Sequence, residues 1–246
     1  MALTASSQDQ ALLLELQAFD TRIAQLDHRA KTIPELATLA GFARDTAALR
    51  LTHAEQKGGL EDIRIELSRI ESDVEVVETR IKRDNERVQV SSSVKDVAAL
   101  EQELAALRKR LADLEEIELA VMERMEDQQK EVDKTSAQRE ALDARTLEVE
   151  VEKDASLGSV IAERGIAASG RSAIEARVPA DLLALYERQR SRYGTGASML
   201  RGGVSLASGV KLLENEMQAI RAAAPDEIIM CASSEAILVR TAESGL

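Results

Sequence analysis

The sequence predicts a mainly α protein, in which a long antiparallel coiled-coil hairpin precedes a small C-terminal α+β domain. Charged residues make up 31% of the 246 residues and aromatic residues only 2%, a composition typical of long helices rather than of a broad globular core. Two stretches carry apolar residues at alternating spacings of three and four, the pattern of a heptad seam. Near the C-terminus, two short turns each lead into an apolar run, with a helical segment between them.

The two seams indicate the arms of the hairpin. The first lies in LEDIRIELSRIESDVEVVETRIKRDNERV, with only the Asp84–Asn85 step missing, and the second in VAALEQELAALRKRLADLEEIELAVMERM. Between them, three serines interrupt the period, and Ser93 with Asp96 can cap the following helix. So short a connection predicts that the second helix folds back on the first. We therefore expect a tip near residues 90–96, formed by Ser91, Ser92, Ser93, Lys95 and Asp96.

Prolines and glycines indicate the ends of the helical region. An earlier periodic helix is interrupted at Pro34, because proline lacks a backbone donor and disfavours helix in the residue before it. Gly165, Gly170 and Pro179 indicate the end of the arms. We expect a helical hairpin over residues 1–178, with a kink near Pro34, and a second domain over residues 179–246. In that second domain, VPADLLALYERQR predicts a short helix and GTGASMLRGG a flexible, basic connector.

Four segments, in this order, resemble bacterial coiled-coil hairpin proteins that end in a four-cysteine zinc ribbon. They are LDHRAKTIPEL, SSSVKDVAALEQELAAL, LYERQRSRYG and APDEIIMCASSEAILVR, and the resemblance covers nearly the whole chain. It implies two Cys-x-x-Cys turns, one falling on Ser205 and Ser208 and the other on Cys231 and Ser234. Glu235 stands where the family usually has glycine.

The resemblance thus implies a zinc-ribbon-like domain that has lost its metal site. Three of the four ligand positions are serine, and a neutral hydroxyl is a poor zinc ligand. We expect no metal and no cofactor, and we expect apolar packing to hold the strands and helix together. Cys231, the one cysteine of the chain, is then expected to be a small buried apolar residue.

One segment, residues 186–203, runs against the charge of the rest of the chain. The whole chain has a formal net charge of −12, whereas this segment holds four arginines against one glutamate. Such a patch with tyrosines can contact nucleic acid or a partner. Alternatively, the arginines can pair with acidic residues and helix-end carbonyls at the base of the hairpin. The candidate contacts are Arg188, Arg190, Arg192, Arg201, Tyr186 and Tyr193.

No catalytic triad, phosphate-binding loop or metal-ligand cluster is visible, so we do not expect an enzyme. The first twenty residues lack a signal-peptide pattern, and no apolar run is long enough to span a bilayer, so we expect a cytoplasmic protein without membrane insertion. The resemblance implies an adaptor, since members of the family are implicated in binding an alternative sigma factor and secretion or flagellar components. The alternative is a nucleic-acid-binding regulator that acts through Arg188–Arg201. The sequence leaves open a homo-oligomer through the side of the coiled coil.

Overall fold

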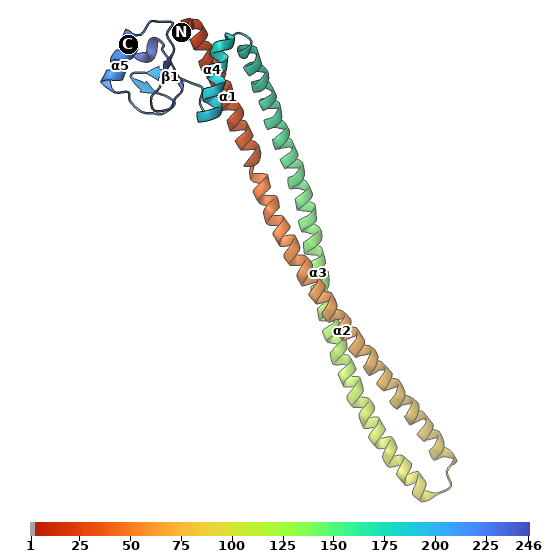
Figure 1. The fold of residues 1–246 in the computed structure, drawn as a ribbon. Helices are drawn as coiled ribbons and strands as arrows, with labels where there is room; N and C mark the ends of the chain where they lie inside the picture. The colour runs from red at the N-terminus through yellow and green to blue at the C-terminus, as the bar shows by residue number, and fades with distance from the viewer. Residues whose placement is uncertain (1–2) are drawn as a thin grey trace. The chain divides into compact units, whose positions relative to one another are not determined.

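The computed structural model describes residues 3–246, in which five helices, four short strands and one 3-10 turn follow one another (Figure 1). Helices account for 78% of the chain, and long helices form a coiled-coil hairpin before a small strand-containing region, which confirms the predicted fold class. The chain divides into two compact units, one comprising Ala37–Val151 and the other the residues up to Leu36 together with Glu152–Leu246.

The unit Ala37–Val151 is an antiparallel helix pair. It contains most of α2 (Pro34–Val90) and the first part of α3 (Val94–Glu175). Contacts between the helices pair rising numbers on α2 with falling numbers on α3. The Gln56 carbonyl accepts from Gln128 at 2.9 Å, Glu66 pairs with Arg124 at 3.0 Å, and Arg80 pairs with Glu103. The apolar seam between them buries Leu60, Val77, Leu100, Leu104, Val121 and Val132.

A polar layer lies just beyond the Leu60–Val132 end of this buried seam. The Nδ1 atom of His53 lies 3.2 Å from Arg139 Nη1, and its Nε2 atom lies 3.1 Å from Ser136 Oγ. Because a guanidinium can only donate, Nδ1 accepts and Nε2 carries the proton that is donated to Ser136. Heptad seams use such polar layers to fix register at a cost in stability.

The second unit begins with helix α1 (Ser7–Lys31), which the Ser6 side chain caps by accepting from the Asp9 backbone N–H at 3.1 Å. The helix ends at Lys31, three residues before Pro34, which opens α2 at the first helical position, where a missing N–H has no cost. After α3 comes the short helix α4 (Ala180–Tyr193), which ends in a left-handed Gly194.

The strand region, residues 197–246, holds a four-stranded sheet in the order β2-β1-β4-β3. Strand β1 (Ala197–Arg201) pairs antiparallel with β2 (Val204–Ser205) and parallel with β4 (Ile237–Val239), which pairs antiparallel with β3 (Ile229–Met230). The expectation of a flexible connector at GTGASMLRGG is therefore wrong, because this segment supplies β1, one of the two central strands. Five residues without a β-branched side chain, set between glycines, carry too little strand signal to outweigh the loop signal.

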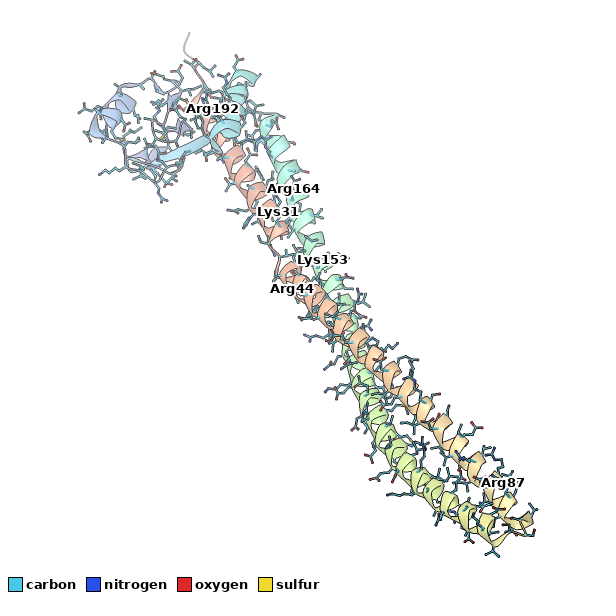
Figure 2. The ribbon with its side chains drawn as sticks, turned by 60° about the horizontal axis from the view of Figure 1, so that its bottom comes forward. Lys31, Arg44, Arg87, Lys153, Arg164 and Arg192 are labelled. Atoms are coloured by element: carbon cyan, nitrogen blue, oxygen red, sulfur yellow. The ribbon has the colours of Figure 1, made fainter. Side chains whose placement is uncertain are left out.

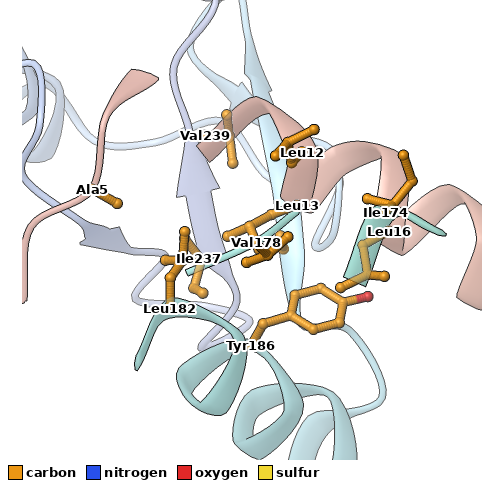
Figure 3. Packing of buried hydrophobic residues seen from close by; sticks show 11 residues of the cluster. Ala5, Leu12, Leu13, Leu16, Ile174, Val178, Leu182, Tyr186, Ile237 and Val239 are labelled. Carbon is orange, nitrogen blue, oxygen red and sulfur yellow. The ribbon is translucent and has the colours of Figure 1, made fainter. Parts of the chain in front are cut away.

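Three apolar clusters hold this unit together, and the smallest joins Leu26 on α1 to Val160 and Ala167 on α3. The largest joins α1, the end of α3, α4 and the sheet around the buried ring of Tyr186 (Figure 3). Gly196 is required beneath that ring, since a Cβ there would lie 2.5 Å from it. The second largest packs helix α5 (Glu214–Ala222) on the other residues of the strand region, and its members are Leu200, Leu212, Met217, Ile220, Cys231 and Leu238.

Candidate functional site

The hairpin tip is a hydrogen-bonded turn that leaves apolar side chains in solvent. The Ser93 hydroxyl accepts from the Asp96 backbone N–H at 3.3 Å and so caps α3, while the Ser91 hydroxyl accepts from the Ser93 N–H at 3.4 Å. Val90 and Val94 flank this turn and are 83% and 86% exposed, the highest values among the large apolar residues described. The predicted tip residues Ser91, Ser92, Ser93, Lys95 and Asp96 therefore surround an apolar pair.

A buried carboxylate, that of Asp84, lies in the seam on α2, close to the tip of the hairpin. Asp84 is 1% exposed, and its Oδ1 lies 3.2 Å from Arg87 Nη1 (Figure 2 labels Arg87). Arg80 and Arg83 lie at 3.9 Å, while Oδ2 is buried without a hydrogen bond from the described residues. The missing heptad step at Asp84–Asn85 was the only signal of this site in the sequence.

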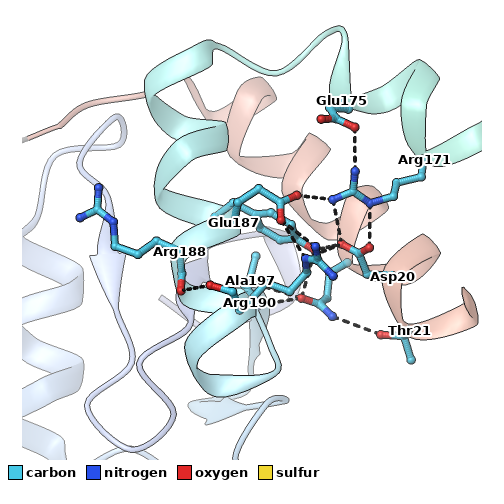
Figure 4. A network of polar contacts seen from close by, with 12 residues as sticks. Asp20, Thr21, Arg171, Glu175, Glu187, Arg188, Arg190 and Ala197 are labelled. Atoms are coloured by element: carbon cyan, nitrogen blue, oxygen red, sulfur yellow. Dashed lines mark hydrogen bonds and ion pairs between the residues drawn. The ribbon is translucent and has the colours of Figure 1, made fainter. Parts of the chain in front are cut away.

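The arginines of the basic segment fall into two groups. Arg190 belongs to the structure, because its Nη2 lies 2.7 Å from Glu187 and its Nε lies 3.5 Å from Asp20 on α1 (Figure 4). Tyr186 is fully buried, so its ring is not available as a surface contact. These two residues fit the structural interpretation of the segment.

The remaining members of the segment lie at the surface. Arg188 and Arg192 are exposed, and among the described residues neither guanidinium forms an ion pair. The Arg192 guanidinium lies 5.3 Å from the ring of Tyr193, which is 45% exposed. Arg201 is exposed and pairs with Glu243 at 3.0 Å. The surface that remains for a ligand is thus centred on Arg188, Arg192 and Tyr193.

The clamp that holds α1, α3 and α4 together has its centre at Arg171, a residue that sequence reasoning missed. Arg171 contacts Asp20 at 2.7 Å and Glu175 at 2.7 Å, and it also pairs with Glu187 (Figure 4). The Tyr186 hydroxyl donates to Asp20 at 2.7 Å, and burial together with this bond raises the pKa of the phenol far above its ordinary value. Both arginines of the clamp, Arg171 and Arg190, are paired with carboxylates inside it, which identifies it as a structural feature.

The two turns that the resemblance singled out have the same backbone geometry. In the first, the Gly209 N–H donates to the Ser205 carbonyl at 2.8 Å and the Ser205 N–H donates to Val210. In the second, the Glu235 N–H donates to the Cys231 carbonyl at 2.8 Å and the Cys231 N–H donates to Ala236. The fifth residue of each turn has a positive φ, 66° at Gly209 and 57° at Glu235. Glycine adopts this conformation freely, whereas glutamate is strained there.

Of the three serines at these turns, Ser205 and Ser234 influence the Cys231 thiol. Ser205 and Cys231 are buried, and the hydroxyls of Ser205 and Ser234 have no hydrogen bond of standard geometry with the described residues. Burial raises the pKa of the thiol, but the two hydroxyls and the backbone N–H groups of Ser233 and Ser234 outweigh it and lower the pKa to about 7. The Ser208 hydroxyl instead accepts from the Val210 N–H at 3.2 Å.

This donor set does not fit a structural zinc ion, which needs four thiolate or imidazole ligands. One thiol and three hydroxyls supply a single soft donor. Among the described residues, no group of three or more His, Cys, Asp or Glu side chains is placed to hold a metal ion.

A groove of about 550 Å³ lies between α1 and α3 and is mainly apolar. Its ionisable side chains are Glu15 and the pair Arg22 and Glu163, which are bound to each other. Phe19, Ile166 and two alanines supply most of the remaining lining. The groove therefore brings together no nucleophile and base of the kind that catalysis requires. In the part of the chain that the structure covers, no helix is long and apolar enough to cross a membrane.

Comparison with known proteins identifies relatives along almost the whole chain. The profile of the CT398-like coiled coil hairpin domain matches residues 16–194. The uncharacterized proteins MT2288 and Rv2229c of Mycobacterium tuberculosis strains are each 32% identical over 237 residues, 96% of this chain and 97% of theirs.

Solved structures give the same result for the fold. A protein of Mycobacterium smegmatis is 30% identical over 97% of this chain and 100% of its own, with a TM-score of 0.88. CT398 from Chlamydia trachomatis is 16% identical over 95% of this chain and 98% of its own, with a TM-score of 0.69. HP0958 from Helicobacter pylori is 13% identical over 96% and 98%, with a TM-score of 0.52. The last two similarities concern the fold alone.

Proposed function

Because this chain belongs to the CT398-like coiled-coil hairpin family, we propose that it is a non-enzymatic adaptor that binds protein partners through its hairpin tip. The proposal extends to regulation of transcription or secretion, which the sequence resemblance implies. The groove between α1 and α3 holds no catalytic arrangement that competes with this interpretation.

The observation that carries the proposal is the exposure of Val90 and Val94 at an ordered turn. The serine hydrogen bonds hold the turn, so the valines are not needed to fold it. Exposing two β-branched apolar side chains costs free energy that burial in a partner would recover, about 25 cal/mol per Å² of apolar surface. Interfaces commonly place such apolar anchors at their centre and polar residues around them, as Lys95 and Asp96 stand here.

Site-specific photo-crosslinking in living cells tests this proposal. A photoreactive amino acid replaces Val90 in one variant and Val76 in the control. Val76 is a matched position, because it is also a valine on α2 and is 66% exposed. We expect a discrete crosslinked protein from position 90 and none from position 76. Equal crosslinking at both positions, or none at either, would contradict a binding site at the tip.

We also propose that the strand region is a zinc-ribbon-like domain that folds without metal. The matching geometry of the two turns supports a common origin with zinc-binding turns, and the apolar cluster around Cys231 supplies the packing. Elemental analysis of the purified protein should find no stoichiometric zinc, and a chelator should leave the melting temperature unchanged. One zinc per chain would refute this.

The alternative, nucleic-acid binding, is favoured by the unpaired Arg188 and Arg192 beside an exposed tyrosine. Replacing both arginines with alanine should weaken binding and flatten its salt dependence by up to about one unit per lost phosphate contact. The control replaces the exposed Arg69 and Arg110 on the hairpin. Filter binding at low and moderate salt compares the nucleic-acid affinity of the two variants with that of the unmodified protein. If the unmodified protein does not bind, or if both variants bind like it, the alternative fails.

A further inference from the structure

The end of the hairpin that carries the tip is basic, although the helix pair behind it is strongly acidic. Between Arg80 and Arg110, eight lysines and arginines stand against five aspartates and glutamates. In the remainder of the unit Ala37–Val151, ten basic residues stand against twenty-two acidic ones. The net charge therefore changes sign along one helix pair, and the basic part is the part that holds the tip.

Three of the basic side chains on α2 gather around one buried carboxylate. Arg87 Nη1 lies 3.2 Å from Asp84 Oδ1, and the Nε atoms of Arg80 and Arg83 each lie 3.9 Å from an Asp84 oxygen. Arg80 also pairs with Glu103. The three arginine side chains are between 52% and 65% exposed. Two carboxylates thus face three guanidinium groups, so a positive charge remains at the surface.

Two lysines add positive charge that no carboxylate offsets. Lys82 on α2 and Lys95 beside Val94 are exposed, and neither forms an ion pair with any residue that the structure describes. Exposed lysines without an ion pair contribute little to the stability of a fold. Both ammonium groups are therefore available to a ligand, and both positions can be changed without loss of the hairpin.

We propose that the partner bound at the tip presents a small apolar pocket bordered by aspartate and glutamate side chains. This inference rests on the proposed adaptor function and adds the chemistry of the partner to it. Val90 and Val94 enter the pocket, and the basic side chains face the carboxylates around it. Lys82 and Arg87 lie within about 12 Å of Val90 along α2, since a helix rises about 1.5 Å per residue. One interface of ordinary size covers all of them.

Nucleic acid and membranes match this surface less well. Proteins that bind single-stranded nucleic acid combine basic side chains with aromatic rings on which bases stack, and residues 80–110 contain no aromatic residue. Helices that lie on a membrane bury a continuous apolar face, whereas the tip offers two valines separated by three serines. An acidic protein surface with an apolar pocket is the ligand that uses both the valines and the charges.

The charges and the valines should act on different rate constants. Opposite potentials steer two proteins toward each other, so they raise the association rate constant and make it fall as salt is added. Loss of buried apolar contacts instead raises the dissociation rate constant. Lysine variants and valine variants of the tip can therefore be told apart by kinetics.

Crosslinking from position 90 tests the chemistry of the partner. The captured protein is digested, and the peptide joined to position 90 is sequenced. We expect aspartate and glutamate to outnumber lysine and arginine in the partner segment that surrounds the crosslinked residue. A neutral or basic segment would overturn this inference and leave the adaptor proposal intact. The absence of a discrete crosslink would remove both.

Rapid-mixing kinetics with the purified captured protein test the charges themselves. Lys82→Glu with Lys95→Glu should lower the association rate constant by about tenfold or more at low salt and flatten its salt dependence. The control is Lys57→Glu with Arg69→Glu, which changes the net charge equally at two exposed positions of α2. The nearer control position lies roughly 30 Å from Val90 along the helix, far beyond the Debye length of about 10 Å at 0.1 M salt. The control should therefore associate like the wild type at that salt concentration.

Three outcomes of these measurements would overturn the inference. The first is an equal loss of association rate in the two double variants, and the second is no loss in either. The third is binding of single-stranded RNA or of anionic vesicles by the wild type that the Lys82→Glu, Lys95→Glu variant loses, because the basic surface would then serve a phosphate ligand. Melting curves establish that each variant is folded.

Discussion

At the scale of single residues, the arginines near α4 differ in what they contact rather than in their sequence context. Arg188, Arg190 and Arg192 alternate along one segment, yet only Arg190 reaches the buried Asp20. Asp20 lies about 150 to 170 residues earlier than its partners, and no local pattern reveals such a contact. The sequence therefore shows that the segment is basic, but it does not reveal which of its arginines are structural and which are exposed.

The clamp should be sensitive to loss of Arg171. This side chain is 16% exposed and faces Asp20, which is 8% exposed. Arg171→Met would leave Arg190 as the only ion-pair partner of Asp20 and Glu187, and breaking a buried pair typically costs about 3 kcal/mol. Denaturant unfolding measures the loss. The matched control is Arg164→Met, one heptad earlier on α3, whose partner Asp27 is exposed, and it should lose much less. Equal losses of unfolding free energy in the two variants would show that the clamp contributes no more to stability than an exposed ion pair.

At the scale of elements, heptad spacing was enough to predict the long helices, because a period of three and four repeats over many turns. The Ser93 cap was predictable for the same reason, since it depends on residues three apart. Strand β1 was not, because its place in the sheet depends on pairing with β4, whose paired residues lie forty positions later. The resemblance implied two equivalent turns, whereas their matching hydrogen bonds could be identified only in the structure.

The seam should become more stable if its buried charge is removed. Asp84 is 1% exposed and keeps one oxygen without a hydrogen bond from the described residues. Asp84→Leu would restore the apolar step, and such replacements of buried ion pairs often stabilise by about 1–3 kcal/mol. Thermal unfolding measures the change. Asp73→Leu, at an exposed position of the same helix, should have little effect. A lower melting temperature for Asp84→Leu would mean that the Arg87 contact outweighs the burial cost.

The two turns should accept zinc if their missing thiols are restored. Replacing Ser205, Ser208 and Ser234 with cysteine would join Cys231 in a four-thiol set on matching turns. We expect one zinc per chain and a melting temperature that falls on adding a chelator. A control with cysteines at Ser72, Ser91 and Ser191, which are scattered, should bind none stoichiometrically. Failure of the first variant to bind zinc would argue against descent from a metal site.

At the scale of the whole molecule, family membership and fold follow from the sequence, whereas the partner does not. The hairpin and the strand region depend on the heptad period and on apolar residues that pack within the chain, and both are encoded in its own sequence. Binding depends on a few exposed side chains whose partners lie outside the chain. Nothing in the sequence distinguishes Val90 and Val94 from other apolar residues near a helix end, and only their exposure in the structure sets them apart.

The most direct test of the adaptor proposal is the affinity of tip variants for the protein that crosslinks at position 90. Val90→Ser with Val94→Ser should weaken binding by at least about tenfold in calorimetry, since the pair loses its apolar burial. The variant should keep the melting temperature of the wild type, because both side chains are already exposed. Val76→Ser should bind like the wild type. Unchanged affinity in the tip variant, with folding intact, would contradict the central claim.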